Sequence, residues 1–258
     1  FDAYVQSWTV VLAILCGLLV LLGVYHVRAL PAGGGAAERH SLRDGLSGLK
    51  EVVGAFFQKK HIWYYIAFIV FYRLGEGFVM KIVPLFLKAD TASGGLGLTN
   101  QQIGLYYGTF GAGAFLLGSL LAGYYIAHRG LRRTLFILCC IFNIPFAVYA
   151  LLAWLQPQSM WIVGGGIVLE YFGYGFGFVG LTLFMMQQVA PGRHQMAHYA
   201  FASGIMNLSV MLTGAVSGYL SDALGYGMFF LAVMLATVPA FLVTWFVPFT
   251  YDDKPNDK

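Results

Sequence analysis

The sequence predicts an all-α membrane protein with seven transmembrane helices. Of the 258 residues, 59% are hydrophobic and only 10% are charged, whereas a globular domain carries about 25% charged residues. Seven apolar segments are each long enough to cross about 30 Å of hydrocarbon as a helix. Lys and Arg are distributed unevenly among the connections between these segments, as expected for a chain with a fixed orientation in a membrane.

From the second segment onward the connections between the segments are short. Short connections predict that neighbouring helices run antiparallel and pack together. Their approximate bounds are 4–26, 61–88, 100–127, 131–155, 160–189, 197–221 and 226–249. Cys16, Cys139 and Cys140 lie within these apolar runs and lack the spacing of a metal site. No signal peptide is visible, and a chain that begins at Phe1 is expected to be a fragment of a longer protein.

The connections carry their basic residues almost entirely on one side of the membrane. Twelve Lys and Arg residues fall on that side, and Lys88 alone falls on the other. The basic side holds the connection between the first two segments, the loop at Arg129, and the C-terminal tail. By the positive-inside rule this side is cytoplasmic. The net charge of +4 therefore reflects membrane topology and does not indicate a nucleic-acid partner.

A polar linker of residues 30–60 separates the first two segments. Pro31–Gly35 is expected to be flexible, and Ser41-Leu-Arg-Asp44 has the form of a helix capping box. Apolar residues then recur at helical spacing at Leu42, Leu46, Leu49, Val53 and Phe56. We expect an amphipathic helix on the inner membrane surface, held there by Lys59 and Lys60. It is either a structural tether or a regulatory or partner-binding element.

The stretch Phe71–Lys81 places three ionisable side chains inside the second apolar segment: Arg73, Glu76 and Lys81. An ionisable group in the middle of a bilayer is costly unless it faces a partner or a watery cavity. Arg73 and Glu76 lie three residues apart on one helix face. They form either a local ion pair that stabilises the helix or a polar face along a substrate or proton path. Lys81 is close enough to the outer end of its helix to reach the membrane surface.

One further acid, Glu170, lies near the middle of the fifth segment. We expect Arg73 to be its partner, either in a static pair that fixes helix register or in a proton-coupled switch. Tyr174, one turn later, shares the face of Glu170. Asn207, in the sixth segment, is a neutral group suited to binding a sugar or an amide. No Ser-His-Asp, HExxH or paired-acid hydrolase pattern is present, so neither an enzyme nor a cofactor or metal site is expected.

Glycine is placed where helices are expected to touch. Gly104–Gly108 and Gly214–Gly218 are small-xxx-small patterns that allow a close approach of helix backbones. The fifth segment holds seven glycines between Gly164 and Gly180. Tight packing explains most of them, and a helix that bends during a transport cycle would also need them.

Four stretches together resemble a known family. They are Tyr72-Arg-Leu-Gly-Glu76, Glu170 with the glycines after it, Ala197-His-Tyr-Ala200 and Ser217-Gly-Tyr-Leu-Ser-Asp-Ala-Leu-Gly-Tyr226. This combination is similar to the AmpG-type muropeptide permeases of the major facilitator superfamily. The loop Gly123–Arg133 departs from the superfamily's cytoplasmic motif because it lacks the acid. His198 stands where Gln is expected, and Arg73 where Lys is common.

The resemblance implies a domain organisation and a function. Residues 1–29 would be the last helix of an N-terminal half, 30–60 the linker, 61–249 a six-helix C-terminal half and 250–258 a cytoplasmic tail. The implied function is proton-coupled import of anhydro-muropeptides across the bacterial inner membrane by alternating access. The implied partners are the lipid bilayer, the N-terminal half of the same carrier, protons and a small glycopeptide.

On this interpretation Glu170 and Glu76 are proton-linked acids, and Arg73 is their counter-ion or an anchor for a substrate carboxylate. The candidate substrate contacts are Tyr72, Tyr174 and Asn207. Two other functions stay open: a carrier of another cargo, such as an acyl-CoA, a peptide or a drug, and a membrane anchor or signalling subunit without transport. A passive anchor has no use for costly buried charges, which argues against the second.

Overall fold

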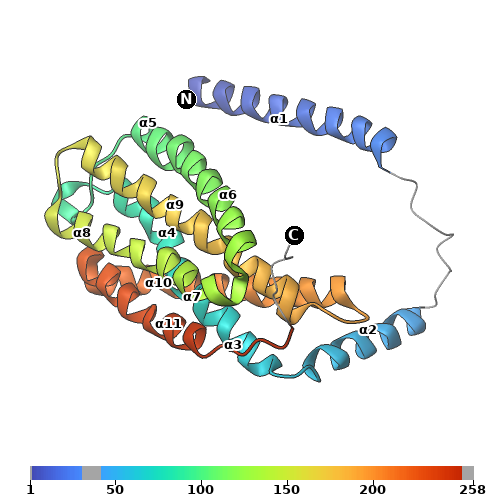
Figure 1. Ribbon diagram of the computed structural model, residues 1–258. Coiled ribbons are helices and arrows are strands. Elements are labelled where there is room, and N and C mark those ends of the chain that lie inside the picture. The colour runs from blue at the N-terminus through green and yellow to red at the C-terminus, as the bar shows by residue number, and fades with distance from the viewer. Residues whose placement is uncertain (1, 31–41, 252–258) are drawn as a thin grey trace. The chain divides into compact units, whose positions relative to one another are not determined.

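The computed structural model describes residues 2–30 and 42–251, with side chains for 4–30 and 48–251. The described residues form helices joined by turns and contain no strand (Figure 1). The chain divides into two compact units, Phe1–Ser47 and Gly48–Lys258, and each is described by itself. The predicted flexible stretch Pro31–Gly35 and the predicted helix cap at Ser41 lie outside the described residues.

The first unit contains helix α1, Asp2–Ala29. Residues Tyr4–Ala29 are long and apolar enough to cross a membrane, with a mean hydropathy of 2.6. The first predicted segment is therefore a single helix.

The second predicted segment is two helices and not one. Helix α3, Ile62–Tyr72, ends at Arg73, and α4, Leu74–Lys88, begins directly after it. The sixth and seventh segments are separate helices as predicted, because α10, Gln195–Ala236, consists of two helical parts joined at a kink. Its main chain turns at Gly225, where φ is 70° and ψ is 161°, a conformation that favours glycine. Helix α11, Val238–Trp245, completes the seventh segment.

The third, fourth and fifth segments are continuous helices that contain short irregular turns. The third consists of α5, Asn100–Ile103, the π-helix η2, Gly104–Phe110, and α6, Gly111–Arg129. The fourth consists of α7, Leu131–Asn143, the 3-10 turn η3, Ile144–Phe146, and α8, Ala147–Leu155. The fifth consists of α9, Met160–Phe184, and the π-helix η4, Met185–Val189. A 3-10 turn, η1, Thr91–Ser93, lies in the loop after α4.

The largest helix contacts join segments that are not neighbours in the sequence. Helix α6 packs along α9, α4 packs along α10, and smaller contacts join α8 to α10 and α11 to α3. The expectation that consecutive segments pack together holds mainly for α7 and α9. Packing between distant segments is favoured because their faces carry small residues, which allow close approach in lipid.

The glycines of α9 account for the close contact with α6. A Cβ added at Gly175 would collide with the carbonyl oxygen of Phe115 on α6, and one added at Gly118 on α6 would collide with the carbonyl oxygen of Phe172. The predicted tight packing of the fifth segment is confirmed here. The prediction for Gly104–Gly108 is wrong for this unit, because an added Cβ at either glycine would meet nothing within 4 Å.

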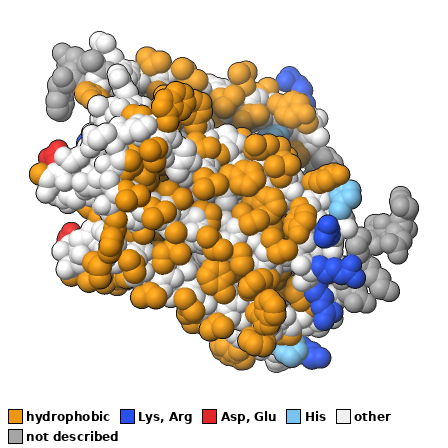
Figure 2. Space-filling model, turned by 60° about the vertical axis from the view of Figure 1, so that its left-hand side comes forward, with side chains coloured by type: hydrophobic (Ala, Val, Ile, Leu, Met, Phe, Trp, Pro, Cys, Tyr) orange, Lys and Arg blue, Asp and Glu red, His pale blue; other side chains and the backbone are white. Residues whose placement is uncertain are grey.

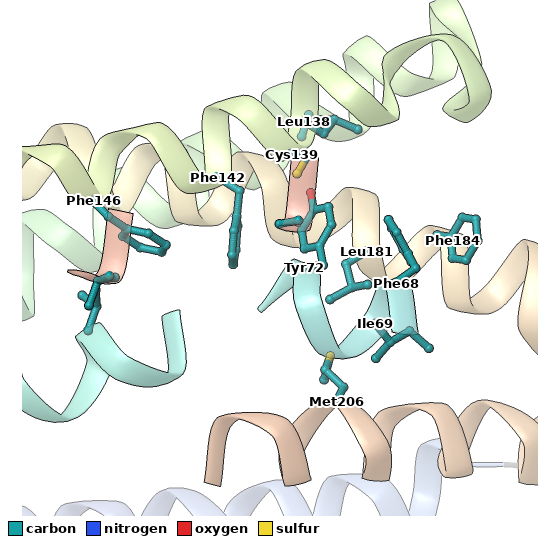
Figure 3. Close-up of a cluster of buried hydrophobic side chains, with 14 of the residues drawn as sticks. Phe68, Ile69, Tyr72, Leu138, Cys139, Phe142, Phe146, Leu181, Phe184 and Met206 are labelled. Atoms are coloured by element: carbon teal, nitrogen blue, oxygen red, sulfur yellow. The ribbon is translucent and has the colours of Figure 1, made fainter. Parts of the chain in front are cut away.

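A cluster of aromatic side chains forms the core where α3, α7 and α9 meet (Figure 3). The ring centroids of Phe68 and Phe184 lie 4.5 Å apart, and those of Tyr72 and Phe142 lie 5.2 Å apart. The hydroxyl of Tyr72 donates a hydrogen bond of 2.9 Å to the carbonyl oxygen of Gly177. Because lipid tails are as apolar as these rings, dense packing and such hydrogen bonds favour the association of the helices.

Helix α2 spans Leu42–Phe57, and its second half, from Gly48 onward, is part of the second unit. Phe56 is buried there with its ring centroid 5.6 Å from that of His198. The carboxylate of Glu51 lies 3.2 Å from the guanidinium of Arg193. The predicted amphipathic helix is therefore present, and its second half contacts protein.

Lys59, two residues after the end of α2, was predicted to hold this helix at the membrane surface, but its ammonium group binds protein instead. Its ammonium group donates to the carbonyl oxygens of Val189, Ala190 and Pro191 at 2.6, 3.2 and 2.6 Å. The last carbonyls of a helix lack partners within it and carry partial negative charge, so a nearby ammonium group stabilises that end. Partial burial lowers the pKa of Lys59. This correction makes Lys59 a cap on the end of η4.

Candidate functional site

The candidate site begins at the break between α3 and α4. At Arg73 the main chain has φ −102° and ψ 7°, outside the helical range. Glu76 lies in the first turn of α4. Gly77 lets this turn approach α10, because an added Cβ would collide with the hydroxyl of Thr213 and lie 3.0 Å from the Cα of Val210. Interrupted helices of this kind are accepted in membranes where protein surrounds the irregular backbone.

Arg73 and Glu76 form a bidentate ion pair. The Nε and Nη2 atoms of Arg73 donate to the two carboxylate oxygens of Glu76. Each residue is only 5% exposed. The guanidinium carbon of Arg73 also lies 5.3 Å from the ring centroid of Phe178 on α9. Two parallel hydrogen bonds to a carboxylate are among the strongest in proteins, and they offset part of the cost of burying both charges.

Glu170 lies in the middle of α9 and is 6% exposed. Its Oε2 atom accepts a hydrogen bond of 2.8 Å from the hydroxyl of Tyr149 on α8. The predicted pairing of Glu170 with Arg73 is therefore corrected in this conformation. The reason is local, because the chain break directs the guanidinium of Arg73 onto Glu76, three residues along its own chain.

Glu76 and Glu170 nevertheless share a site, because both line one small cavity. Its volume is about 40 Å³, enough for a few water molecules at about 10–15 Å³ each. The wall comes from four segments, α4, η2, α8 and α9. Its members are Glu76, Val79, Met80, Tyr107, Tyr149, Glu170, Tyr171 and Tyr174. The cavity therefore combines two carboxyl groups with four tyrosines, an arrangement suited to binding and passing on protons.

Of the predicted substrate contacts, Tyr174 lines the cavity and Tyr72 and Asn207 do not. Tyr72 is fully buried against Gly177, while Asn207 is exposed on α10. Lys81 is exposed, lies against Gly214 of α10 and does not line the cavity. The substrate roles of Tyr72, Tyr174 and Asn207 stay predictions.

A larger groove of about 610 Å³ lies between α6 and α9. Its lining is apolar apart from Thr109. It therefore offers no charge for recognising a polar ligand, and the small cavity with its two acids is the better candidate for function.

One family model matches residues 70–258, most of the chain, and its description is Major Facilitator Superfamily. The chain belongs to the Major Facilitator Superfamily. Membership points to a transporter rather than an enzyme. In the described residues five stretches are long and apolar enough to cross a membrane, the last of them, Gln195–Trp245, covering two predicted segments. A member of this superfamily with these helices is a multi-pass membrane protein.

Within this superfamily, the chain is similar to several individual permeases and transporters. The anhydromuropeptide permease of Escherichia coli K12 is 25% identical over 188 residues, covering 73% of this chain and 37% of the relative. A putative transporter AmpG 2 of Rickettsia typhi is 25% identical over 205 residues, covering 75% and 46%. Another AmpG 2 from Rickettsia felis is 27% identical over 203 residues, covering 74% and 45%. The chain spans less than half the length of these relatives.

Three of the four tyrosines that line the cavity were not predicted from the sequence: Tyr107, Tyr149 and Tyr171. Tyr149 carried no signal, because its contact with Glu170 depends on how α8 packs against α9. Tyr107 lies within the Gly104–Gly108 pattern, which predicted packing and drew attention to the glycines. Tyr171 follows Glu170 directly, and that proximity was the one available signal for it.

Proposed function

We propose that the chain is part of a proton-coupled secondary transporter that imports anhydro-muropeptides across the bacterial inner membrane by alternating access. Membership of the superfamily supports a transporter. The relative named anhydromuropeptide permease supports the cargo, and those named putative transporter support transport. Import of this cargo would return cell-wall fragments to the cytoplasm for recycling.

The observation that carries the proposal is the placement of Glu76 and Glu170 on one buried cavity beside an interrupted helix. Carriers often bind substrate and coupling ions at discontinuous helices near the middle of the membrane. Buried carboxyl groups that gain or lose a proton change the local charge, and this change favours one conformation over another. Glu76 and Glu170 are the proposed proton-linked acids.

Arg73 has two roles in this proposal. It neutralises Glu76 when the site is empty of substrate. It also offers a guanidinium that can bind a carboxylate of a peptide substrate once Glu76 is protonated, because a guanidinium binds planar anions in a bidentate way. Tyr174, Tyr72 and Asn207 are proposed substrate contacts in other conformations of the carrier.

The proposed site is completed by a second half. In such carriers the substrate lies between two halves, so this chain would supply one wall and the N-terminal half of the same carrier the other. The proposed orientation places the C-terminus in the cytoplasm. The face shown in Figure 2 is in keeping with a membrane protein of fixed orientation, since Lys and Arg side chains gather along one side of it and hydrophobic side chains cover most of the rest.

Uptake by the full-length carrier in proteoliposomes tests the proposal. We expect a proton gradient to drive accumulation of GlcNAc-anhydroMurNAc peptide, and Glu170→Gln to abolish the response to the gradient. Glu51→Gln is the matched control, because Glu51 is exposed and contacts Arg193. Gradient-driven uptake that is unchanged by Glu170→Gln would remove the role of Glu170. If the carrier takes up an acyl-CoA or a drug and not the muropeptide, the proposed cargo is wrong.

A further inference from the structure

The cavity between Glu76 and Glu170 contains more hydrogen-bonding groups than two independent acids require. It is about 40 Å³ in volume and lined by both acids and four tyrosines. A polar cavity of this size holds water when several polar groups can bind it. We propose that this cavity is a shared-proton site, in which water bridges the carboxyl groups of Glu76 and Glu170 and Tyr149 positions the carboxyl of Glu170.

The charges around the cavity support one shared proton. Arg73 is the cation at the site, and its Nε and Nη2 atoms both donate to Glu76. Tyr107 faces the cavity from η2, Tyr149 from α8, and Tyr171 and Tyr174 from α9. With one guanidinium and two carboxyl groups, the site is neutral when it holds one proton. A second buried negative charge without a cation is strongly disfavoured, so the proton is held at the pair.

Movement of the proton within the site requires no other reactant. The proton leaves the carboxyl group of Glu170 for the bridging water, and the same water gives a proton to Glu76. Glu170 is then a carboxylate, and Glu76 becomes neutral. The attraction between Glu76 and Arg73 weakens as a result, which leaves the guanidinium available to an anion. This inference rests on the proposed role of the two acids in proton coupling.

Tyr149 holds the Glu170 end of the pair in place. Its hydroxyl donates to Oε2 of Glu170 at 2.8 Å, and its ring lies 5.6 Å from that of Phe230 in a fully buried position. Packing therefore fixes the hydroxyl. A donated hydrogen bond favours a carboxylate over a neutral carboxyl group, so its loss makes Glu170 retain a proton to higher pH.

Infrared titration of the reconstituted full-length carrier, without cargo, tests this site directly. We expect an absorption of a protonated carboxyl group that disappears as pH rises and is missing in Glu170→Gln. Tyr149→Phe keeps the ring and removes the hydroxyl, and it should raise the midpoint by about one pH unit. Tyr65→Phe is the matched control. It also removes a buried hydroxyl, one bonded to Thr250 and not to an acid, and should leave the midpoint unchanged.

A second variant tests whether the proton is shared. Glu76→Gln removes one acid and leaves Arg73 to interact with Glu170, so the midpoint should fall. This arm remains informative if Tyr149→Phe does not fold. Midpoints that are unchanged in both Tyr149→Phe and Glu76→Gln would overturn the inference. Shifted midpoints in a carrier that does not transport muropeptides would support this site and remove the proposed cargo. Muropeptide uptake with unshifted midpoints would support the proposed cargo and overturn the shared-proton site.

Discussion

Gly77 sets how closely the first turn of α4, and with it Glu76, can approach α10. An added Cβ would collide with Thr213 and lie 3.0 Å from the Cα of Val210. A main-chain atom cannot move away as the end of a side chain can. The absence of a side chain at this position therefore allows the helix contact that holds the ion pair in place.

Gly77→Ala should lower the stability of the full-length carrier by about 1–3 kcal/mol, the usual cost of overpacking a core. Thermal unfolding in detergent would measure it. Gly123→Ala is the matched control, because an added Cβ there meets nothing within 4 Å and alanine favours a helix by about 1 kcal/mol. Equal unfolding temperatures for both variants would contradict the importance of this contact.

The residues of the candidate site were predictable to different degrees. The Arg73–Glu76 pair follows from a spacing of three residues, which local sequence shows directly. The hydrogen-bond partner of Glu170 could not be predicted from local sequence. A buried carboxyl group requires some partner, but sequence does not say whether a guanidinium or a tyrosine hydroxyl reaches it. That choice depends on the packing of α8 against α9, which sequence pattern alone does not determine.

At the scale of the helices, hydrophobic length predicted the segments, including the division between the sixth and the seventh at the Gly225 kink. It missed the break within the second segment at Arg73. Hydropathy is an average over many residues, so a change of backbone direction at one residue leaves it unaltered. The helical spacing of Leu42–Phe56 did predict α2, but the surface covered by its second half depended on tertiary contacts.

Lys59→Met should loosen the end of η4, because three carbonyl oxygens lose the ammonium group that they share. A hydrogen bond to a charged group contributes about 1.5–3 kcal/mol when well formed, so amide protection around Val189 should fall by at least about tenfold. Hydrogen exchange measured by mass spectrometry checks this. Lys60→Met is the matched control, since Lys60 is exposed. Unchanged exchange in Lys59→Met would show that the cap contributes little.

At the scale of the whole chain, the distribution of Lys and Arg predicts the orientation. Single cysteines at two positions test it in a background of Cys16→Ser, Cys139→Ser and Cys140→Ser. A cysteine at position 133, replacing Arg133, should react with a membrane-impermeant reagent only after the inner membrane is opened. A cysteine at position 90, replacing Asp90, should react in intact spheroplasts. The opposite pattern of labelling would reverse the proposed topology.

The contact between α6 and α9 restricts how Glu170 can move. Main chain meets main chain at Gly118 and Gly175, so no flexible side chain lies between the helices to absorb a displacement. A screw movement of α9 by one residue, a rotation of about 100° with a rise of about 1.5 Å, would bring the ring of Tyr174 or Phe176 to the point of closest approach. We therefore expect α6 and α9 to move together, so that a displacement of α6 would also displace the carboxyl group of Glu170.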